Sequence, residues 1–202
     1  MPLKIDRLNL MLVFATLLSV FSSFSVMAAK VSFKEFCPQL VGQWAGDAAK
    51  AGEIPRKVAV TGFCSHDQRQ LILSVSIGTR APFSETWWFR EQGDQVLLTY
   101  YDGVAEDKQQ LFSLYRQNGD YSLLGEGVVN ARPALIQLLF DAQTQTQTQT
   151  QTQTQTQTQA QAQAQNQAGG WQWTQNIQYL DDDIDRYQLF RGIEMTPVAP
   201  SP

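Results

Sequence analysis

The sequence predicts an all-β protein, a single antiparallel up-and-down β-barrel of about eight or nine strands. Three observations favour this fold class. Apolar and polar residues alternate with period two in many segments, turn residues separate these segments, and no long amphipathic helix interrupts them. Closing such a sheet into a barrel removes its exposed edges, and a two-sheet β-sandwich is the alternative.

The first 28 residues predict a secretory signal peptide rather than a part of the fold. Lys4 and Arg7 give a basic start, and an apolar run covers 8–24. Val26 and Ala28 then occupy the two positions before the cleavage site that a signal peptidase recognises. Cleavage after Ala28 would place the mature chain in the periplasm or outside the cell, with no stable membrane insertion. An uncleaved membrane anchor is the alternative, although the run is short for crossing a bilayer.

A capping-box pattern predicts one helical turn directly after this segment. Ser32 would accept a hydrogen bond from the Glu35 amide, and the Glu35 carboxylate would accept one from the Ser32 amide. Val31 and Phe36 stand at the two hydrophobic staple positions. Because Pro38 disfavours a helical conformation at the residue before it, we expect the turn to end there and the first strand to follow.

Nine segments have the alternation that is typical of half-buried strands. In 71–77 the apolar residues alternate with polar ones, and in 171–179 two tryptophans, Ile177 and Tyr179 oppose a face of Gln, Thr and Asn. The predicted strands are 40–46, 56–64, 71–77, 84–91, 95–101, 109–116, 120–129, 171–179 and 184–191. The segment 133–140 is ambiguous, because Pro133 suits the first turn of a helix and the run also suits a buried strand.

Turn signals lie between these strands. Asn118-Gly119 predicts a type I′ hairpin, because both central residues of that turn need positive φ. Gln92-Gly93-Asp94 and Asp102-Gly103 predict two further turns. These short connections favour strands that are neighbours in sequence and in space.

Residues 142–168 are an uncharged segment of Gln-Thr and Gln-Ala repeats. Both faces of a strand built from this repeat would be polar, so neither face gains by burial, and we expect a disordered surface insertion. Self-association of the tract is the alternative. The barrel domain then comprises 29–141 and 169–194, and 195–202 is expected to be a flexible tail.

The two cysteines, Cys37 and Cys64, predict one structural disulfide. An even number of cysteines in an exported chain is typical of disulfide pairing. Such a bridge would stabilise the fold by roughly 3 kcal/mol. A redox role would require a closer spacing, of the Cys-x-x-Cys kind, which is absent from the sequence.

Composition excludes several classes of function. With 202 residues, 43% hydrophobic, the chain is too apolar to be fully disordered, and its net charge of −4 gives no basic excess for nucleic acid. The single histidine, His66, lies in a polar stretch that predicts a surface turn rather than a catalytic base. We expect no catalytic residues, no metal and no cofactor.

Two acidic features are candidate sites. The cluster Asp181-Asp182-Asp183 with Asp185 lacks the register of an EF-hand loop and predicts a solvated hairpin turn, with weak calcium binding as the alternative. Glu85 stands near Trp87 and Trp88, a combination found in carbohydrate sites, so a hydrolase that uses Glu85 and an aspartate is a further hypothesis.

The tripeptide Gly42-Gln43-Trp44 after a short helical turn resembles the opening of the lipocalins and the broader calycin barrels. The resemblance implies a calycin-like barrel whose closed end is plugged by Trp44. It also implies that an arginine from the last strand, Arg186 or Arg191, packs over the indole of that tryptophan.

The resulting functional expectation is a non-enzymatic barrel that binds a small hydrophobic or amphipathic molecule. Strand neighbours point to opposite faces, so only one of Trp87 and Trp88 can face the interior. The predicted ligand-binding residues are Trp44, Trp88, Tyr100, Trp173 and Arg186. The alternative is an envelope protein-interaction module, such as an inhibitor or an assembly factor.

Overall fold

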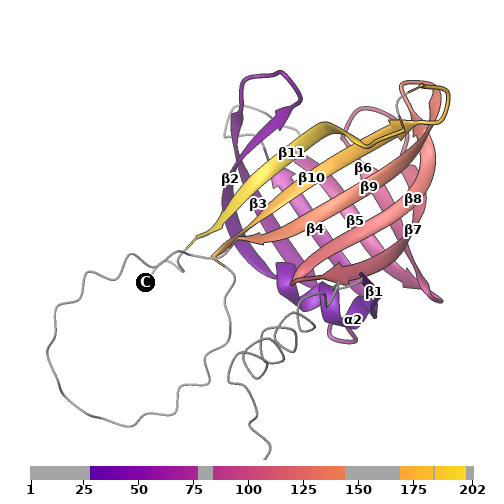
Figure 1. Cartoon of the computed structure of the whole chain (residues 1–202). Helices are drawn as coiled ribbons and strands as arrows, with labels where there is room; N and C mark the ends of the chain where they lie inside the picture. Colours follow the sequence, from indigo (N-terminus) through magenta and orange to yellow (C-terminus); the bar gives the residue numbers. More distant parts are fainter. Residues whose placement is uncertain (1–27, 77–83, 144–168, 184, 199–202) are drawn as a thin grey trace, which may run out of the picture.

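Alternating sequence patterns give rise to a closed antiparallel β-barrel in the computed structural model, which confirms the predicted fold class (Figure 1). The structure describes residues 28–76, 84–143, 169–183 and 185–198. The predicted signal peptide, except for Ala28, and nearly all of the Gln/Thr repeat lie outside these residues, so both remain predictions.

The barrel strands follow one another along the chain as an up-and-down meander. They are β2 (Gly42–Lys50), β3 (Arg56–Cys64), β4 (Gln70–Ser76), β5 (Ser84–Gln92), β6 (Gln95–Tyr101), β7 (Lys108–Gln117), β8 (Asp120–Val129), β9 (Arg132–Gln143), β10 (Gly170–Tyr179) and β11 (Gln188–Pro197). Every strand pairs with its neighbours in sequence, and β2 pairs with β11 to close the barrel. The two-residue strand β1 (Ala29–Lys30) pairs with the end of β7.

The strand number is slightly higher than predicted, and the ambiguous segment accounts for the difference. Residues 133–140 belong to β9, whose inner face buries Ala134, Ile136, Leu138 and Phe140. Leucines also stand on the outer face of this strand, at positions 135 and 139, where they are half-buried. Because apolar residues occupy both faces, the sequence shows no alternation there.

The last strand lies later in the chain than predicted. Instead of 184–191, β11 covers Gln188–Pro197, and Ile193 and Met195 are buried, so the strand extends into the segment that was expected to be a flexible tail. The loop before β11 is attached to β9 instead, because Arg132 on β9 donates hydrogen bonds of 2.6 Å to both Asp181 and Asp182. The acidic cluster therefore belongs to this loop and not to the last strand.

The hairpin turns explain the register of two strand pairs. Asn118 and Gly119 have φ values of 54° and 99°, which confirms the type I′ prediction between β7 and β8. A second turn with two positive φ angles joins β8 to β9 at Asn130 (51°) and Ala131 (61°). The sequence did not reveal this turn, because alanine stands where glycine is usual.

Replacing Ala131 with glycine is expected to raise the free energy of unfolding by about 1 kcal/mol. A left-handed conformation costs a residue with a Cβ about 1–2 kcal/mol, and the added freedom of glycine in the unfolded chain removes part of the gain. Urea unfolding followed by tryptophan fluorescence measures the change. Ala45→Gly, at an exposed strand position, is the control and should destabilise by about 0.5–1 kcal/mol; equal effects of the two variants would contradict the prediction.

A short helical segment closes one end of the barrel. The predicted capping box forms at the start of α2 (Phe33–Phe36), where Ser32 Oγ accepts from the Lys34 amide at 3.2 Å. A 3₁₀ turn, η2 (Cys37–Leu40), follows and runs into β2. It approaches β3 so closely that a Cβ at Gly62 would overlap the Leu40 carbonyl, so glycine is required there.

The predicted disulfide joins this helical segment to the barrel wall. Cys37 and Cys64 are bonded, with their Cα atoms 5.5 Å apart. Phe36, which precedes Cys37 in the chain, is fully buried, and its ring packs against Phe89, Tyr121 and Phe140 on three different strands. The aromatic cluster fills the closed end, so any space inside the barrel must lie toward the opposite end.

Candidate functional site

A cavity of about 840 Å³ occupies the barrel interior toward the end opposite α2. Its mouth is formed by Asp102 after β6, Lys108 at the start of β7, and the turn residues Asn130 and Ala131. Its apolar wall comes from inward-facing residues of β6, β7, β9 and β10, namely Leu98, Phe112, Ile136, Leu138 and Trp173. Strand alternation therefore supplies a hydrophobic lumen with a polar opening.

Missing side chains on β8 help to create this space. Gly125 and Gly127 follow Leu123 on the inward face of the strand. At Gly125 a Cβ would overlap the Leu111 carbonyl, so this glycine allows β7 and β8 to approach closely. At Gly127 the nearest atom would instead be Nε2 of the Gln110 side chain, at 2.6 Å. The missing side chain at Gly127 thus leaves space in the lumen, and its nearest neighbour there is the flexible side chain of Gln110.

Arg191 is the central charged group of the cavity wall. Its Nη1 lies 3.3 Å from Glu85 Oε2 and donates to Tyr100 Oη at 3.3 Å. Its Nε donates to Gln175 Oε1 at 2.7 Å. The same carboxylate oxygen, Glu85 Oε2, also accepts a hydrogen bond from Trp87 Nε1 at 3.3 Å. These groups form one polar cluster on β5, β6, β10 and β11.

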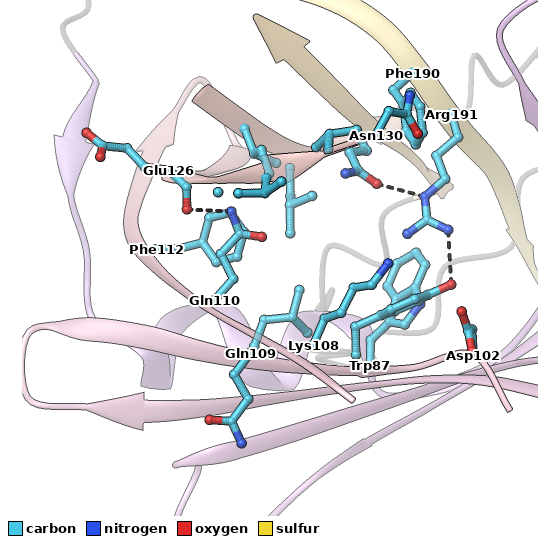
Figure 2. A pocket seen from close by; sticks show the side chains of 18 of the residues that line it. Trp87, Asp102, Lys108, Gln109, Gln110, Phe112, Glu126, Asn130, Phe190 and Arg191 are labelled. Atoms are coloured by element: carbon cyan, nitrogen blue, oxygen red, sulfur yellow. Dashed lines mark hydrogen bonds between the residues drawn. The ribbon is translucent and has the colours of Figure 1, made fainter. Parts of the chain in front are cut away.

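Three aromatic rings surround the Arg191 guanidinium. Its Cζ lies 5.0 Å from the Tyr100 ring centroid, 5.5 Å from that of Trp173 and 5.7 Å from that of Trp87. Figure 2 shows Arg191 extending across the cavity toward Trp87. The rings of Trp87 and Trp173 pack against each other, with centroids 4.2 Å apart. Cation–π attraction therefore holds the guanidinium where the hydrogen bonds also place it.

One buried donor in this wall has no partner. Trp173 is 2% exposed, and its Nε1 makes no hydrogen bond among the described residues. A buried N–H group without a partner is costly, so an acceptor on a bound molecule would stabilise it. Burial also raises the pKa of the Tyr100 hydroxyl above its usual value.

A second polar group lies on the opposite side of the opening. Gln110 Nε2 donates to the Glu126 carbonyl at 2.9 Å, as drawn in Figure 2. In the same view the Glu126 carboxylate points away from the cavity. Lys108 and Asp102 contribute one charge of each sign near the mouth. The charges of Lys108 and Asp102 therefore balance each other at the mouth.

The structure brings together only part of the predicted ligand-binding set. Tyr100 and Trp173 line the cavity. Trp88 does not, because it faces outward, where the Arg90 guanidinium lies 4.1 Å from its ring and its Nε1 donates to Gln70. Trp87 takes the inner position instead. The sequence contained a signal that Trp87 and not Trp88 faces inward. Trp87 shares its face of β5 with the apolar Phe89, whereas Trp88 shares the other face with Arg90.

The predicted pairing of Trp44 with an arginine of the last strand is wrong. Trp44 is buried at the closed end of β2, and no described arginine lies over its ring. Arg186 is exposed in the loop before β11 and lines no part of the cavity. Arg191 does point inward, but it packs on Trp87, Tyr100 and Trp173, because β11 begins later than expected and places this residue toward the open end.

The acidic cluster near the barrel mouth is explained by an ion pair. Arg132 binds Asp181 and Asp182, and its guanidinium lies 3.9 Å from the Tyr179 ring centroid. Within the described ranges, no group of three or more His, Cys, Asp or Glu residues is arranged to hold a metal ion. None of the helices in that part of the chain is long and apolar enough to cross a membrane.

Comparison with known proteins gives no family assignment: no family model and no curated protein matches the chain. The fold itself, a closed antiparallel barrel that follows a short helical turn, is consistent with a calycin-like architecture.

Proposed function

We propose that this chain is a non-enzymatic carrier that encloses a small hydrophobic or amphipathic molecule in its barrel. The observation that carries the proposal is the cavity of about 840 Å³, within the range of about 300–1,000 Å³ that is usual for small-molecule sites. Its wall combines aromatic and aliphatic side chains with a few polar groups, as such sites generally do. The lipocalins use a barrel interior in the same way.

The arrangement of polar groups favours binding over catalysis. Glu85, the carboxylate of the hydrolase hypothesis, is engaged by Arg191 and by the Trp87 indole. A general acid or base must exchange protons with a substrate, whereas Glu85 Oε2 already accepts hydrogen bonds from two side chains of the protein. We therefore propose that this cluster positions a ligand rather than transforms one.

The proposed location is the periplasm or the extracellular space. The Cys37–Cys64 disulfide supports an oxidising compartment, because such bonds are rare in the cytosol. The predicted signal peptide supports the same location. Intact mass under denaturing conditions tests both: cleavage after Ala28 and the loss of two hydrogens are expected, and an uncleaved or fully reduced chain would contradict the location.

The experiment for the carrier proposal is native mass spectrometry of protein purified from its own envelope. A species heavier than the chain that releases a small molecule on activation is expected. Binding of the uncharged fluorescent probe N-phenylnaphthylamine provides a second measurement, with a rise in fluorescence when the probe enters an apolar site. A native mass equal to the bare chain together with no probe binding would overturn the proposal.

A protein-interaction module is the second candidate, and one observation favours it. Phe63 is 60% exposed on the outer face of the barrel, beside Ile72 on the neighbouring strand. Exposed apolar side chains of this kind are common at protein interfaces. Cross-linking in the envelope tests it: a partner that is captured by the wild type and lost with Phe63→Glu would favour this function.

A further inference from the structure

The cavity separates polar from apolar groups along its depth. Glu85 is the second residue of β5 and Tyr100 the last but one of β6, so both lie near the open end. Phe112 and Leu138 lie further along their strands, toward the aromatic cluster of the closed end. An elongated ligand would therefore place its apolar part inward and its polar part beside Arg191.

The polar cluster is already neutral before a ligand enters. The positive charge of Arg191 is matched by Glu85 at 3.3 Å, beside the rings of Trp87, Tyr100 and Trp173, and the two charged side chains are 22% and 28% exposed. An anionic head group on the same guanidinium would face the Glu85 carboxylate, and a cationic one would face Arg191. In a partly buried site either repulsion is only weakly screened.

Hydrogen-bonding capacity nevertheless remains in this cluster. Arg191 Nη2 makes no hydrogen bond with the described residues, and the Trp173 Nε1 donor has no partner. The Trp173 donor is buried, so an acceptor on a ligand would remove the cost of leaving it unpaired. Arg191, whose side chain is 22% exposed, can offer its Nη2 group to the same acceptor, which need not be charged.

We infer that the ligand is an uncharged amphiphile: a single apolar chain that extends toward Phe112 and Leu138, with a neutral, hydrogen-bond-accepting head group, such as a hydroxyl, ester or amide, at Arg191 and Trp173. This inference rests on the proposed function and specifies the chemical class of its ligand. Glu85 is the residue that sets the preference, because it occupies the charge of Arg191.

The test compares three probes with the same lauryl-length chain: monolauroylglycerol, laurate and lauryltrimethylammonium. Each is titrated below its micelle concentration against bound N-phenylnaphthylamine. The wild type is expected to bind monolauroylglycerol at least about tenfold more tightly than either charged probe. Tighter binding of laurate, or of the cation, would overturn the inference and leave the carrier proposal standing, whereas failure of all three probes and of N-phenylnaphthylamine would overturn both.

Two substitutions reverse the charge balance from opposite sides. Glu85→Gln leaves Arg191 unmatched and is expected to improve laurate binding at least about tenfold, and Arg191→Gln leaves Glu85 unmatched and should improve binding of the cation similarly. Glu91→Gln, on the same strand but paired with Arg69, is the matched control and should leave all three affinities unchanged. Circular dichroism confirms folding of each variant; folded variants with wild-type selectivity would overturn the inference.

Discussion

Replacing Phe36 with alanine is expected to lower the free energy of unfolding by about 3–5 kcal/mol. The Phe36 ring is fully buried, and its centroid lies 5.1 Å from that of Phe140, 5.2 Å from Tyr121 and 6.2 Å from Phe89. These partners stand on β9, β8 and β5. Truncation therefore removes one residue that joins three strands at the closed end and leaves a cavity that the rigid barrel wall cannot fill by collapse.

Phe63→Ala is the matched control, because the same atoms are removed from a side chain that is 60% exposed. We expect it to change the free energy of unfolding by less than about 1 kcal/mol. Urea unfolding followed by circular dichroism measures both variants, and Phe36→Leu keeps the comparison measurable if Phe36→Ala does not fold. A Phe36→Ala effect no larger than that of Phe63→Ala would show that the aromatic cluster does not stabilise the closed end.

How far the sequence predicts this fold depends on whether one face of a strand is polar. In β10, Trp171, Trp173 and Ile177 are buried as predicted, because Gln and Thr mark the opposite face. In β9 the leucines on both faces hide the alternation, and the strand is ambiguous without its neighbours. The start of β11 was misplaced for another reason: the Arg132–Asp181 pair links residues 49 positions apart in the chain.

The candidate site is less predictable than the fold, because residues that lie far apart in the sequence form it. Tyr100 and Trp173 follow from aromatic content on predicted strands, and the position of Phe89 could have assigned Trp87 to the interior. The Arg191–Glu85 pair spans 106 residues and depends on barrel closure, which local patterns do not encode. The glycines of β8 carry no side-chain signal at all, although they determine where the lumen is open.

That role of glycine leads to the largest expected effect on binding. Gly127→Trp is expected to weaken binding of N-phenylnaphthylamine by about 100-fold. The new side chain would extend from β8 into the lumen, where its first carbon displaces the Gln110 amide and meets Ile136. If the indole denies the ligand about 100 Å² of apolar contact, the loss is about 2.5 kcal/mol, or nearly two orders of magnitude in the dissociation constant.

An outward-facing residue of the neighbouring strand provides the control. Leu111 on β7 is 41% exposed and is not part of the cavity lining, so Leu111→Trp adds an indole outside the barrel. We expect its probe affinity to stay within about threefold of the wild type. Fluorescence titration measures both variants, after circular dichroism has confirmed that each is folded. Equal losses in the two would mean that the probe binds the outer surface near the rim; no loss in either would mean that it binds elsewhere. Only a loss confined to Gly127→Trp assigns binding to the lumen.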